Sequence, residues 1–385
     1  MAPPPRLTAI VDQIVSSSPA RKTQANSLAE KQADAELLQE VQSELVYLST
    51  LEGGITRREG KRGFLYYDAQ GNRVKDPAEI ERIAALAIPP AYSDVLISPV
   101  PNSHLQAIGI DARGRKQYRY HPDWHAERGK AKFALLPAFA ASLPKIRVQV
   151  DEDLNRRKPG FEKALATVVW LLDNLFIRVG NAHYAEENGS FGATTLRNRH
   201  VTVNGSKVQF HFKGKSGKEW KLSHGDRRIV RAIRTLQELP GQQLFQYLDE
   251  DGKRHGVGSA DVNAYIKDIA GANFSSRQFR TWGATRLAAS AFADLAPATS
   301  QRERKQQVNA VIDQVAAKLV NTRAVCRASY IHPRIFEDFE AGRLVDLKRM
   351  RPSKSRMLTE WMSDDEIRVL RWLKRPGETA SLSDG

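Results

Sequence analysis

The segment FEKALATVVWLLDNLFIRVG, residues 161–180, carries apolar side chains on nearly every side of a helix. A helix that is apolar all round is buried, so this segment predicts the central helix of a domain. The next segment, HVTVNGSKVQFHFKGKSGKEWKLSH (200–224), alternates apolar and polar residues between two glycine-containing turns, which predicts a three-stranded antiparallel sheet. Helical periods dominate from 226 to 340. We therefore expect residues 129–340 to form one mainly helical domain.

Upstream of this domain, residues 51–128 have the pattern of a small β-rich module. The stretch GFLYYDAQGNRVKD (63–76) places an aromatic run, a turn and a second short strand in hairpin order. A short helix is predicted near Pro77 to Leu86. The fold class is therefore α+β, and we expect a hinge in the linker near residues 124–145.

The two ends of the chain have patterns of their own. Residues 1–50 begin with a Pro-rich stub and enter an acidic stretch with a helical period from Leu28 to Leu48, which predicts an appended arm. Residues 341–385 contain the basic string KRMRPSKSRM and the amphipathic segment WMSDDEIRVLRWLKRP. We expect them to form a basic tail with a short amphipathic helix.

Charge and composition narrow the class of protein. The 385 residues include 59 Lys and Arg against 44 Asp and Glu, a formal net charge of +15. Residues 1–50 carry a net charge of −2, residues 51–130 carry +3 and the remainder carries +14, a local excess that suits a polyanionic partner. No stretch approaches the roughly 18 consecutive apolar residues of a membrane span. The single Cys326 forms no internal disulfide, and no Cys and His spacing indicates zinc, so we expect a cytoplasmic protein.

One dense group of cations lies in the β-rich module. The string DARGRKQYRYHPDW (111–124) interleaves four cations with two tyrosines. Cations beside aromatic rings suit phosphate and base contacts, although a solvated loop has the same composition. The residues are Arg113, Arg115, Lys116, Tyr118, Arg119 and Tyr120.

Four residues of the large domain are candidates for chemistry, and each has an ordinary structural role as well. Arg178 follows an apolar helix just before Gly180, where a cation complements the helix dipole. Lys215 lies in the turn GKSGK, where an exposed lysine is the usual residue. Arg280, in SSRQFRTWGATRL, opens a helix, and Tyr330, in VNTRAVCRASYIHP, lies where a core aromatic is common. Taken one at a time, none of them indicates a function.

Taken in order, these motifs resemble the type IB DNA topoisomerases of the small bacterial and poxvirus-like kind. The matching strings are FIRVGNAHY, FKGKSGK, RQFRTWGA and NTRAVCRASY, together with YAEENGSFGATTLRNRHV and the upstream GRKQYRY. The resemblance covers residues from about 52 to 335. It implies the catalytic fold that these enzymes share with tyrosine recombinases. It also implies an isomerase that relaxes positive and negative supercoils in double-stranded DNA by single-strand cleavage, rotation and religation.

The resemblance implies a role for each candidate. Tyr330 attacks a DNA phosphodiester and forms a 3′-phosphotyrosyl link, which conserves the bond energy, so ATP is not needed. Arg178 and Arg280 clamp the non-bridging oxygens and stabilise the charge of the transition state. Lys215 protonates the leaving 5′ oxygen. Because side-chain cations supply the electrostatic stabilisation, we expect no cofactor and no metal.

One position departs from the family pattern. Where the family often has a histidine, this chain has Asn321, nine residues before the candidate tyrosine. Asparagine donates a hydrogen bond to a phosphate oxygen but carries no charge at neutral pH, so we expect it to act by hydrogen bonding. His200 and His332 are expected to be structural. Arg277, in the same motif as the second catalytic arginine, is expected to assist at the phosphate.

The resemblance also implies DNA contacts outside the active site. Gln117, Tyr118 and Tyr120 match family residues that touch DNA from the N-terminal domain, and Tyr184 matches one in the catalytic domain. The two domains are expected to close around duplex DNA as a monomeric clamp whose binding depends steeply on salt. The expected location is the bacterial nucleoid, with no membrane partner.

Two other functions remain open at this point. A tyrosine recombinase or integrase uses nearly the same Arg, Lys, Arg and Tyr set, but usually pairs the second arginine with a preceding histidine and begins with a helical DNA-binding domain. A non-catalytic basic DNA-binding protein would explain the charge alone. Such a protein gives Tyr330 no special role, whereas both enzymes require a covalent DNA adduct there.

Overall fold

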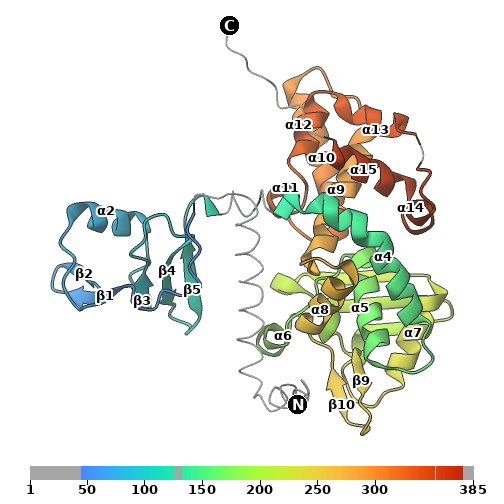
Figure 1. The fold of residues 1–385 in the computed structure, drawn as a ribbon, viewed down its shortest axis with the longest axis horizontal. Helices are drawn as coiled ribbons and strands as arrows, with labels where there is room; N and C mark the ends of the chain where they lie inside the picture. The colour runs from blue at the N-terminus through green and yellow to red at the C-terminus, as the bar shows by residue number, and fades with distance from the viewer. Residues whose placement is uncertain (1–44, 125–128, 130–131, 352, 376–385) are drawn as a thin grey trace, which may run out of the picture. The chain divides into compact units, whose positions relative to one another are not determined.

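A computed structural model describes residues 45–124, 129, 132–351 and 353–375. The chain divides into two compact units, of which unit 1 ends at Ala134 and unit 2 begins at Leu135 (Figure 1). Within these described residues, no helix is both long and apolar enough to cross a lipid bilayer.

Unit 1 is built on a five-stranded antiparallel sheet with the strand order β2-β1-β3-β4-β5. Its helix α2 (Pro77–Ala85), predicted from the sequence, begins at the N-cap Asp76 and buries Ile83 against Val95 and Ile97 of the sheet. A second, smaller apolar cluster includes Tyr118 and Tyr120. The strands are β1 (Ile55–Gly60), β2 (Gly63–Tyr67), β3 (Ser93–Ile97), β4 (Leu105–Ile110) and β5 (Lys116–Tyr120).

The hairpin predicted at residues 63–76 is only partly right. Strand β2 begins at Gly63, but its main partner is the upstream strand β1, with Arg57 opposite Tyr66. The downstream strand is reduced to one bridge between Tyr67 and Arg73. The chain leaves the sheet after this bridge because helix α2 follows four residues later.

The N-terminal arm lies largely outside the described residues, and so does most of the helix predicted from Leu28 to Leu48. Its last residues are not helical, because the backbone of Val46 bridges to Ser103 and accepts a hydrogen bond from the amide of His104. The arm therefore ends as an extended segment attached to the sheet of unit 1.

Unit 2 is mainly helical, and the predicted apolar helix α5 (Phe161–Leu175) packs against α4, α7, α8 and α9. The helix ends at Leu175 and not near Gly180, because Phe176 adopts a left-handed backbone conformation with φ of 54°. The other helices are α4 (Leu136–Leu154), α6 (Ala182–Asn188), α7 (Arg227–Gln237), α8 (Ser259–Ala270), α9 (Arg277–Ala293), α10 (Gln301–Leu319), α11 (Arg323–Ser329), α12 (Arg334–Glu340), α13 (Asp346–Arg349), α14 (Arg356–Trp361) and α15 (Asp364–Lys374).

The three-stranded antiparallel sheet of unit 2 confirms the sequence pattern. Strands β6 (Val201–Asn204), β7 (Lys207–Lys213) and β8 (Glu219–His224) pair in chain order. The alternating apolar residues of β7 are buried and the residues between them are exposed. A second hairpin, β9 (Gln246–Leu248) and β10 (Arg254–Gly256), was not predicted because three residues are too few to show alternation.

The interval predicted as a hinge, residues 124–145, has two different parts. Residues 125–128 and 130–131 lie outside the described structure. From Leu136 onward the chain belongs to α4, where Phe139 and Leu143 are fully buried. A hinge within 136–145 is therefore wrong, because these residues form part of the core of unit 2.

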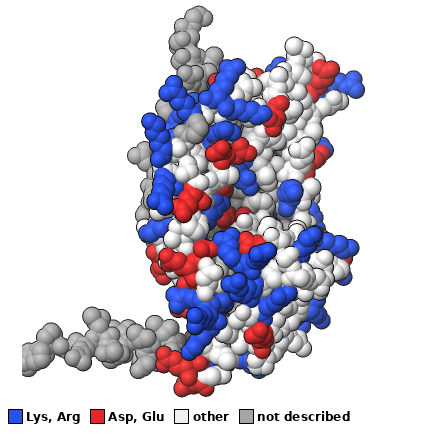
Figure 2. All heavy atoms as spheres, turned by 90° about the vertical axis from the view of Figure 1, so that its right-hand side faces the viewer, with Lys and Arg blue, Asp and Glu red and all other residues white. Residues whose placement is uncertain are grey.

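The basic excess of the large domain lies partly on one helix. In α7 the apolar residues Ile229, Val230 and Ile233 are buried, whereas Arg227, Arg228, Arg231 and Arg234 are exposed. Figure 2 shows one face of the molecule, on which Lys and Arg cover wide areas with Asp and Glu among them. The solvent face of this helix is thus a source of positive charge separate from the candidate site.

Burial in unit 1 can be tested at one strand position. Ile97 in β3 is fully buried, so Ile97→Ala should lower the free energy of unfolding by about 2–5 kcal/mol. The measurement is native-state hydrogen exchange at the amides of β3 and β4. Ile80→Ala on α2 is the control, because Ile80 is 39% exposed and should change stability by less than about 0.5 kcal/mol. Equal protection in the two variants would contradict the assigned core.

Candidate active site

Arg280 is the most buried of the candidate residues, with 3% of its surface exposed. It lies in the first turn of α9, where its Nη1 donates to the carbonyl of Phe176 and its Nη2 donates to the carbonyl of Leu319 at 2.9 Å. These carbonyls lie at the ends of α5 and α10. Burial, together with the charge of Arg178, lowers the pKa of Arg280 to about 10, so the guanidinium is charged at neutral pH.

Arg178 follows the left-handed end of α5, and its backbone is held by a tight turn. Its carbonyl accepts a hydrogen bond from the amide of Ala193 at 2.7 Å. Gly192 approaches so closely that a Cβ there would lie 2.6 Å from the Arg178 oxygen and 2.5 Å from Cα of Gly180. This contact holds the arginine backbone against residues 192–194.

Asn321 lies beside Arg178, with its Oδ1 accepting from Arg178 Nη2 at 2.6 Å. The geometry arises because α10 ends at Leu319 and Val320 turns the chain with φ of 49°. The Nδ2 of Asn321 is buried and has no hydrogen-bond partner among the described residues. The Nε of Arg280 is likewise buried without a hydrogen-bond partner among the described residues. The site therefore contains two donors that a bound oxygen could satisfy.

Tyr330 ends helix α11 and lies against Arg280, with 5.0 Å between the guanidinium carbon and the ring centroid. Its carbonyl accepts from Thr285 Oγ1 at 3.2 Å, which ties it to α9. Burial favours the neutral phenol, but the charges of Arg280, Arg178 and Arg277 outweigh burial and lower the pKa of Tyr330. The cations therefore favour the phenolate, which is the stronger nucleophile.

Lys215 is not joined to these residues. It is exposed in the turn between β7 and β8, and within the described structure no hydrogen bond or ion pair connects it to the other four candidates. The base of this turn is nevertheless anchored, because the Lys213 carbonyl accepts from the amide of Phe191 at 2.7 Å. Phe191 directly precedes the turn that holds the Arg178 backbone. Lys215 thus extends from a strand attached to the site.

Two residues near the tyrosine were not identified from the sequence. Cys326, one helical turn before Tyr330, is fully buried. Burial raises the pKa of its thiol and outweighs the charges of Arg280 and Lys218, which lower it. Lys218 lies in the same turn as Lys215. The four-residue spacing from Cys326 to Tyr330 was the only signal in the sequence, because residues at that spacing share a helix face.

The remaining candidates are divided between the two units. In β5 the side chains of Tyr118 and Tyr120 stack at 6.2 Å between ring centroids. Gln117 points to the opposite face and donates to Asp111 at 2.9 Å. The side chain of Tyr184 lies outside the described structure.

His200 is buried and His332 is half-buried, and each accepts a backbone hydrogen bond at Nδ1. His200 accepts from the amide of Arg197 and His332 from that of Arg334. Burial, together with nearby arginines, lowers the pKa of each imidazole to about 4, so both are neutral at pH 7. No group of three His, Cys, Asp or Glu that could hold a metal lies within the described part of the chain.

Fold and site together define a class. A tyrosine beside two arginines, on a helical unit with a three-stranded sheet, is typical of enzymes that transfer a DNA strand to a tyrosine. Type IB topoisomerases and tyrosine recombinases both belong to this class.

Comparison with known proteins distinguishes between a type IB topoisomerase and a tyrosine recombinase. A family model described as the eukaryotic DNA topoisomerase I catalytic core matches residues 121–354, and one described as the bacterial DNA topoisomerase IB N-terminal domain matches residues 63–111. The chain belongs to the type IB DNA topoisomerase family. It is therefore an isomerase that acts on DNA, and the recombinase and non-catalytic alternatives are not supported.

Named relatives agree with this family. DNA topoisomerase 1B of Acanthamoeba polyphaga mimivirus is 33% identical over 285 residues, which cover 72% of this chain and 85% of the viral one. DNA topoisomerase 1 of rabbit fibroma virus is 25% identical over 42% of this chain, and DNA topoisomerase 1B of vaccinia virus (strain Western Reserve) is 23% identical over 41%. The matched regions span about half of each of these two poxvirus proteins.

The turn that holds Arg178 can be tested by adding one methyl group. Gly192→Ala places a Cβ within 2.6 Å of backbone atoms of Arg178 and Gly180, so the backbone at this contact must shift. A displacement of about 1 Å at a catalytic group can cost roughly 100-fold, so single-turnover DNA cleavage should fall by about 10- to 100-fold. Gly225→Ala is the matched control, because its nearest neighbours would lie 3.8 Å from the new Cβ. Equal cleavage by both variants would contradict this role of the turn.

The charge environment of Tyr330 predicts a pH dependence. Nearby cations lower its pKa, so single-turnover cleavage should rise with pH through an apparent pKa below the ordinary value of about 10. Arg277→Ala removes one of these charges and should shift the profile to higher pH, with a slower rate at pH 8 and convergence at alkaline pH. Arg302→Ala, an exposed cation on α10, should leave the profile in place. A rate loss equal at every pH would contradict an electrostatic role for Arg277.

Proposed function

We propose that Tyr330 is the nucleophile of the topoisomerase reaction and that Arg178, Arg280 and Asn321 bind the phosphate that it attacks. The observation that carries the proposal is the meeting of these four side chains, which come from the ends of α5, α10 and α11 and from the first turn of α9. Buried donors without partners are costly, so a phosphate oxygen is the expected partner of Arg280 Nε and Asn321 Nδ2.

The reaction moves one bond. Tyr330 Oη bonds to phosphorus while the bond from phosphorus to the 5′ oxygen breaks. The phenol releases its proton to water, and the leaving oxygen gains one from Lys215. The products are a 3′-phosphotyrosyl link and a free 5′-hydroxyl, and the reverse step religates the strand. Because the link conserves the bond energy, religation needs no ATP, and the arginines supply the electrostatic stabilisation that a metal ion would otherwise provide.

Asn321 has a role that a histidine cannot perform in the same way. Its amide accepts from Arg178 through Oδ1, which leaves Nδ2 to donate to a phosphate oxygen. The amide does not titrate, so this hydrogen bond is independent of pH. Arg178 is meanwhile oriented by the amide oxygen before substrate binds.

Lys215 is proposed as the general acid, although no hydrogen bond or ion pair among the described residues joins it to the other four candidates. A lysine is normally protonated at neutral pH and can donate to the leaving oxygen. The turn is exposed and is anchored at its base through Lys213 and Phe191, so we propose that the turn moves on DNA binding and carries the ammonium group to the leaving oxygen.

DNA binding is proposed to extend over both units. Tyr118, Tyr120 and Gln117 of unit 1 and Tyr184 and Arg277 of unit 2 contact the duplex, and the exposed arginines of α7 add to its electrostatic attraction. The protein acts as a monomer that closes around DNA as a clamp, in which the free 5′ end rotates. A DNA substrate and a positive net charge support a location on the bacterial nucleoid.

The experiment that tests the proposal is plasmid relaxation with chelator and without ATP. Wild-type protein should relax both negatively and positively supercoiled plasmid without strand exchange. Tyr330→Phe lacks the nucleophilic oxygen, so its relaxation rate should fall by at least about 10³-fold while duplex binding is retained.

The matched control is Tyr247→Phe, a half-buried tyrosine in β9. It should relax plasmid like the wild type. Trapped wild-type complexes should carry DNA on Tyr330 through a 3′ phosphate, identified by peptide mapping. An adduct on another residue, or equal relaxation by Tyr330→Phe, would overturn the assignment.

A further inference from the structure

The C-terminal segment beyond the matched catalytic core is packed onto the helices that carry the active site. The family match ends at residue 354, and α14 and α15 follow it. Both helices pack against α4, and α15 also packs against α9. The sequence predicted an amphipathic helix here, but its partner is visible only in the structure. Ile367, Leu370 and Trp372 of α15 are buried.

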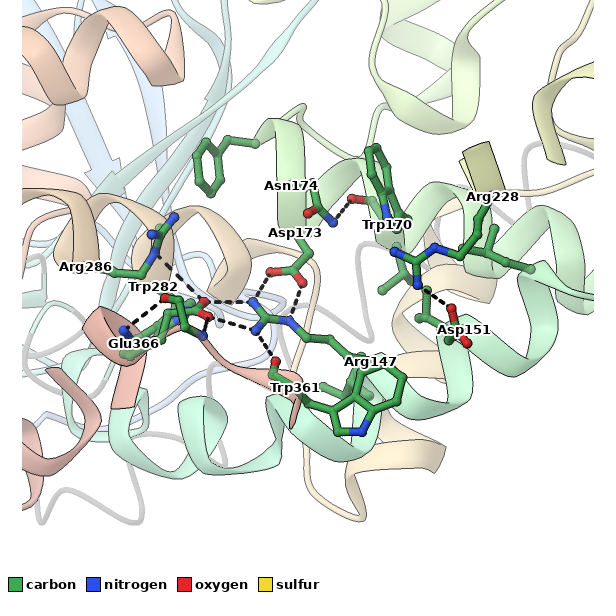
Figure 3. A pocket seen from close by; sticks show the side chains of 17 residues that line it. Arg147, Asp151, Trp170, Asp173, Asn174, Arg228, Trp282, Arg286, Trp361 and Glu366 are labelled. Atoms are coloured by element: carbon green, nitrogen blue, oxygen red, sulfur yellow. Dashed lines mark hydrogen bonds and ion pairs between the residues drawn. The ribbon is translucent and has the colours of Figure 1, made fainter. Parts of the chain in front are cut away.

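Glu366 is the polar centre of that contact and is 6% exposed. Its Oε1 accepts from Arg147 Nη2 at 2.8 Å and from Trp282 Nε1 at 3.2 Å, and its Oε2 accepts from Arg147 Nη1 at 2.9 Å (Figure 3). Arg147 in α4 also binds Asp173 in α5 at 2.7 Å. A single carboxylate of α15 thus connects α4 and α9, and through Arg147 it connects α5.

The contact on α9 lies next to the catalytic residues. Trp282 is two positions after Arg280, and Thr285, which donates to the Tyr330 carbonyl, is three positions later. Between them, Gly283 packs so tightly on the ring of Phe176 that an added Cβ would overlap it. The carbonyl of Phe176 is the one that accepts from Arg280. Residues 280–285 therefore connect the C-terminal helices, the phosphate-binding arginine and the tyrosine.

Arg147, Trp282 and Glu366 are among the residues that line a cavity of about 340 Å³, shown in Figure 3. Arg147 is paired with Asp173 and Glu366, and Arg228 is paired with Asp151. No unpartnered buried side-chain donor or acceptor lines the cavity within the described residues. These charge pairs connect α4 to α5, α7 and α15.

Glu366 is ionised in this setting. Burial alone favours its neutral form, but hydrogen bonds and charge from Arg147 outweigh burial and lower its pKa to about 2. An ionised acceptor makes stronger hydrogen bonds than a neutral one, so the Trp282 indole is held more firmly than by packing alone.

We propose that Glu366 is a positioning residue for strand cleavage, which acts through Trp282 to set the orientation of α9 and of Arg280 against the scissile phosphate. The inference rests on the proposed role of Arg280. A helix held only by apolar packing can rotate by small amounts, whereas an indole N–H bound to a fixed carboxylate restrains that rotation. The C-terminal helices thereby contribute to catalysis through their contact with α9.

The test compares cleavage chemistry with stability and DNA affinity. Glu366→Gln keeps the shape but weakens the bonds to Arg147 and Trp282. Single-turnover cleavage of a suicide DNA substrate, at saturating DNA and well below the melting temperature, should fall by about 10-fold with Kd for duplex unchanged. Trp282→Phe removes only the indole donor. Trp282→Phe should also lower the cleavage rate. If Glu366→Gln does not fold, Trp282→Phe alone tests whether the bond between Glu366 and Trp282 positions α9.

Asp153→Asn is the matched control. Asp153 is also a buried carboxylate that accepts from an aromatic side chain, Tyr265 Oη at 2.7 Å, and from Arg156 at 2.6 Å. Asp153 joins α4 to α8, and among the described residues no hydrogen bond or ion pair connects its side chain to α9. The control should lose stability while its cleavage rate stays within about twofold of the wild type.

A double variant separates positioning from general stability. If Glu366 acts through Arg280, then adding Glu366→Gln to Arg280→Lys should lower cleavage by less than about twofold beyond Arg280→Lys alone. A full 10-fold further loss would overturn the inference, and so would cleavage rates for Glu366→Gln and Trp282→Phe that match the Asp153→Asn control. If Arg280→Lys itself cleaves like the wild type, the proposed role of Arg280 fails instead.

Discussion

Arg280 carries a positive charge into the interior of unit 2, and two helix ends meet at that charge. Helix C-termini present carbonyls without intrahelical partners and carry partial negative charge. The Arg280 guanidinium donates hydrogen bonds to carbonyls at the ends of both α5 and α10, those of Phe176 and Leu319. A buried cation is costly unless it is hydrogen-bonded, and these two carbonyls stabilise the guanidinium. The geometry of the site follows from this constraint.

The constraint explains two unusual backbone positions. Phe176 and Val320 both adopt positive φ without being glycine, a conformation that costs about 1–3 kcal/mol when the surrounding structure enforces it. Each follows a helix whose last carbonyls bind Arg280. Val320 directly precedes the site residue Asn321, and Phe176 lies two residues before Arg178. Backbone strain at two helix ends therefore brings the arginine and the amide into contact.

The second set of contacts on α9 shows how a segment outside the catalytic core takes part in the same structure. Trp282 and Thr285 face Glu366 and the Tyr330 backbone from one short stretch of helix. The same stretch of helix thus contacts both the C-terminal helix α15 and the backbone of Tyr330. Its position depends on partners distant in sequence, Arg147 being 219 residues from Glu366.

The sequence by itself determined the α+β class, the apolar helix α5, the sheet β6–β8 and the motifs that carry Arg178, Arg280 and Tyr330, because periodicity and short motifs are local. It did not reveal where α5 ends, since that depends on a carbonyl bonded to Arg280 from 104 residues away. The pairing of β2 and the docking of the C-terminal helices were also decided by partners far along the chain. Only tertiary structure brought Asn321 to Arg178, because contact between distant residues is a property of packing and not of local pattern.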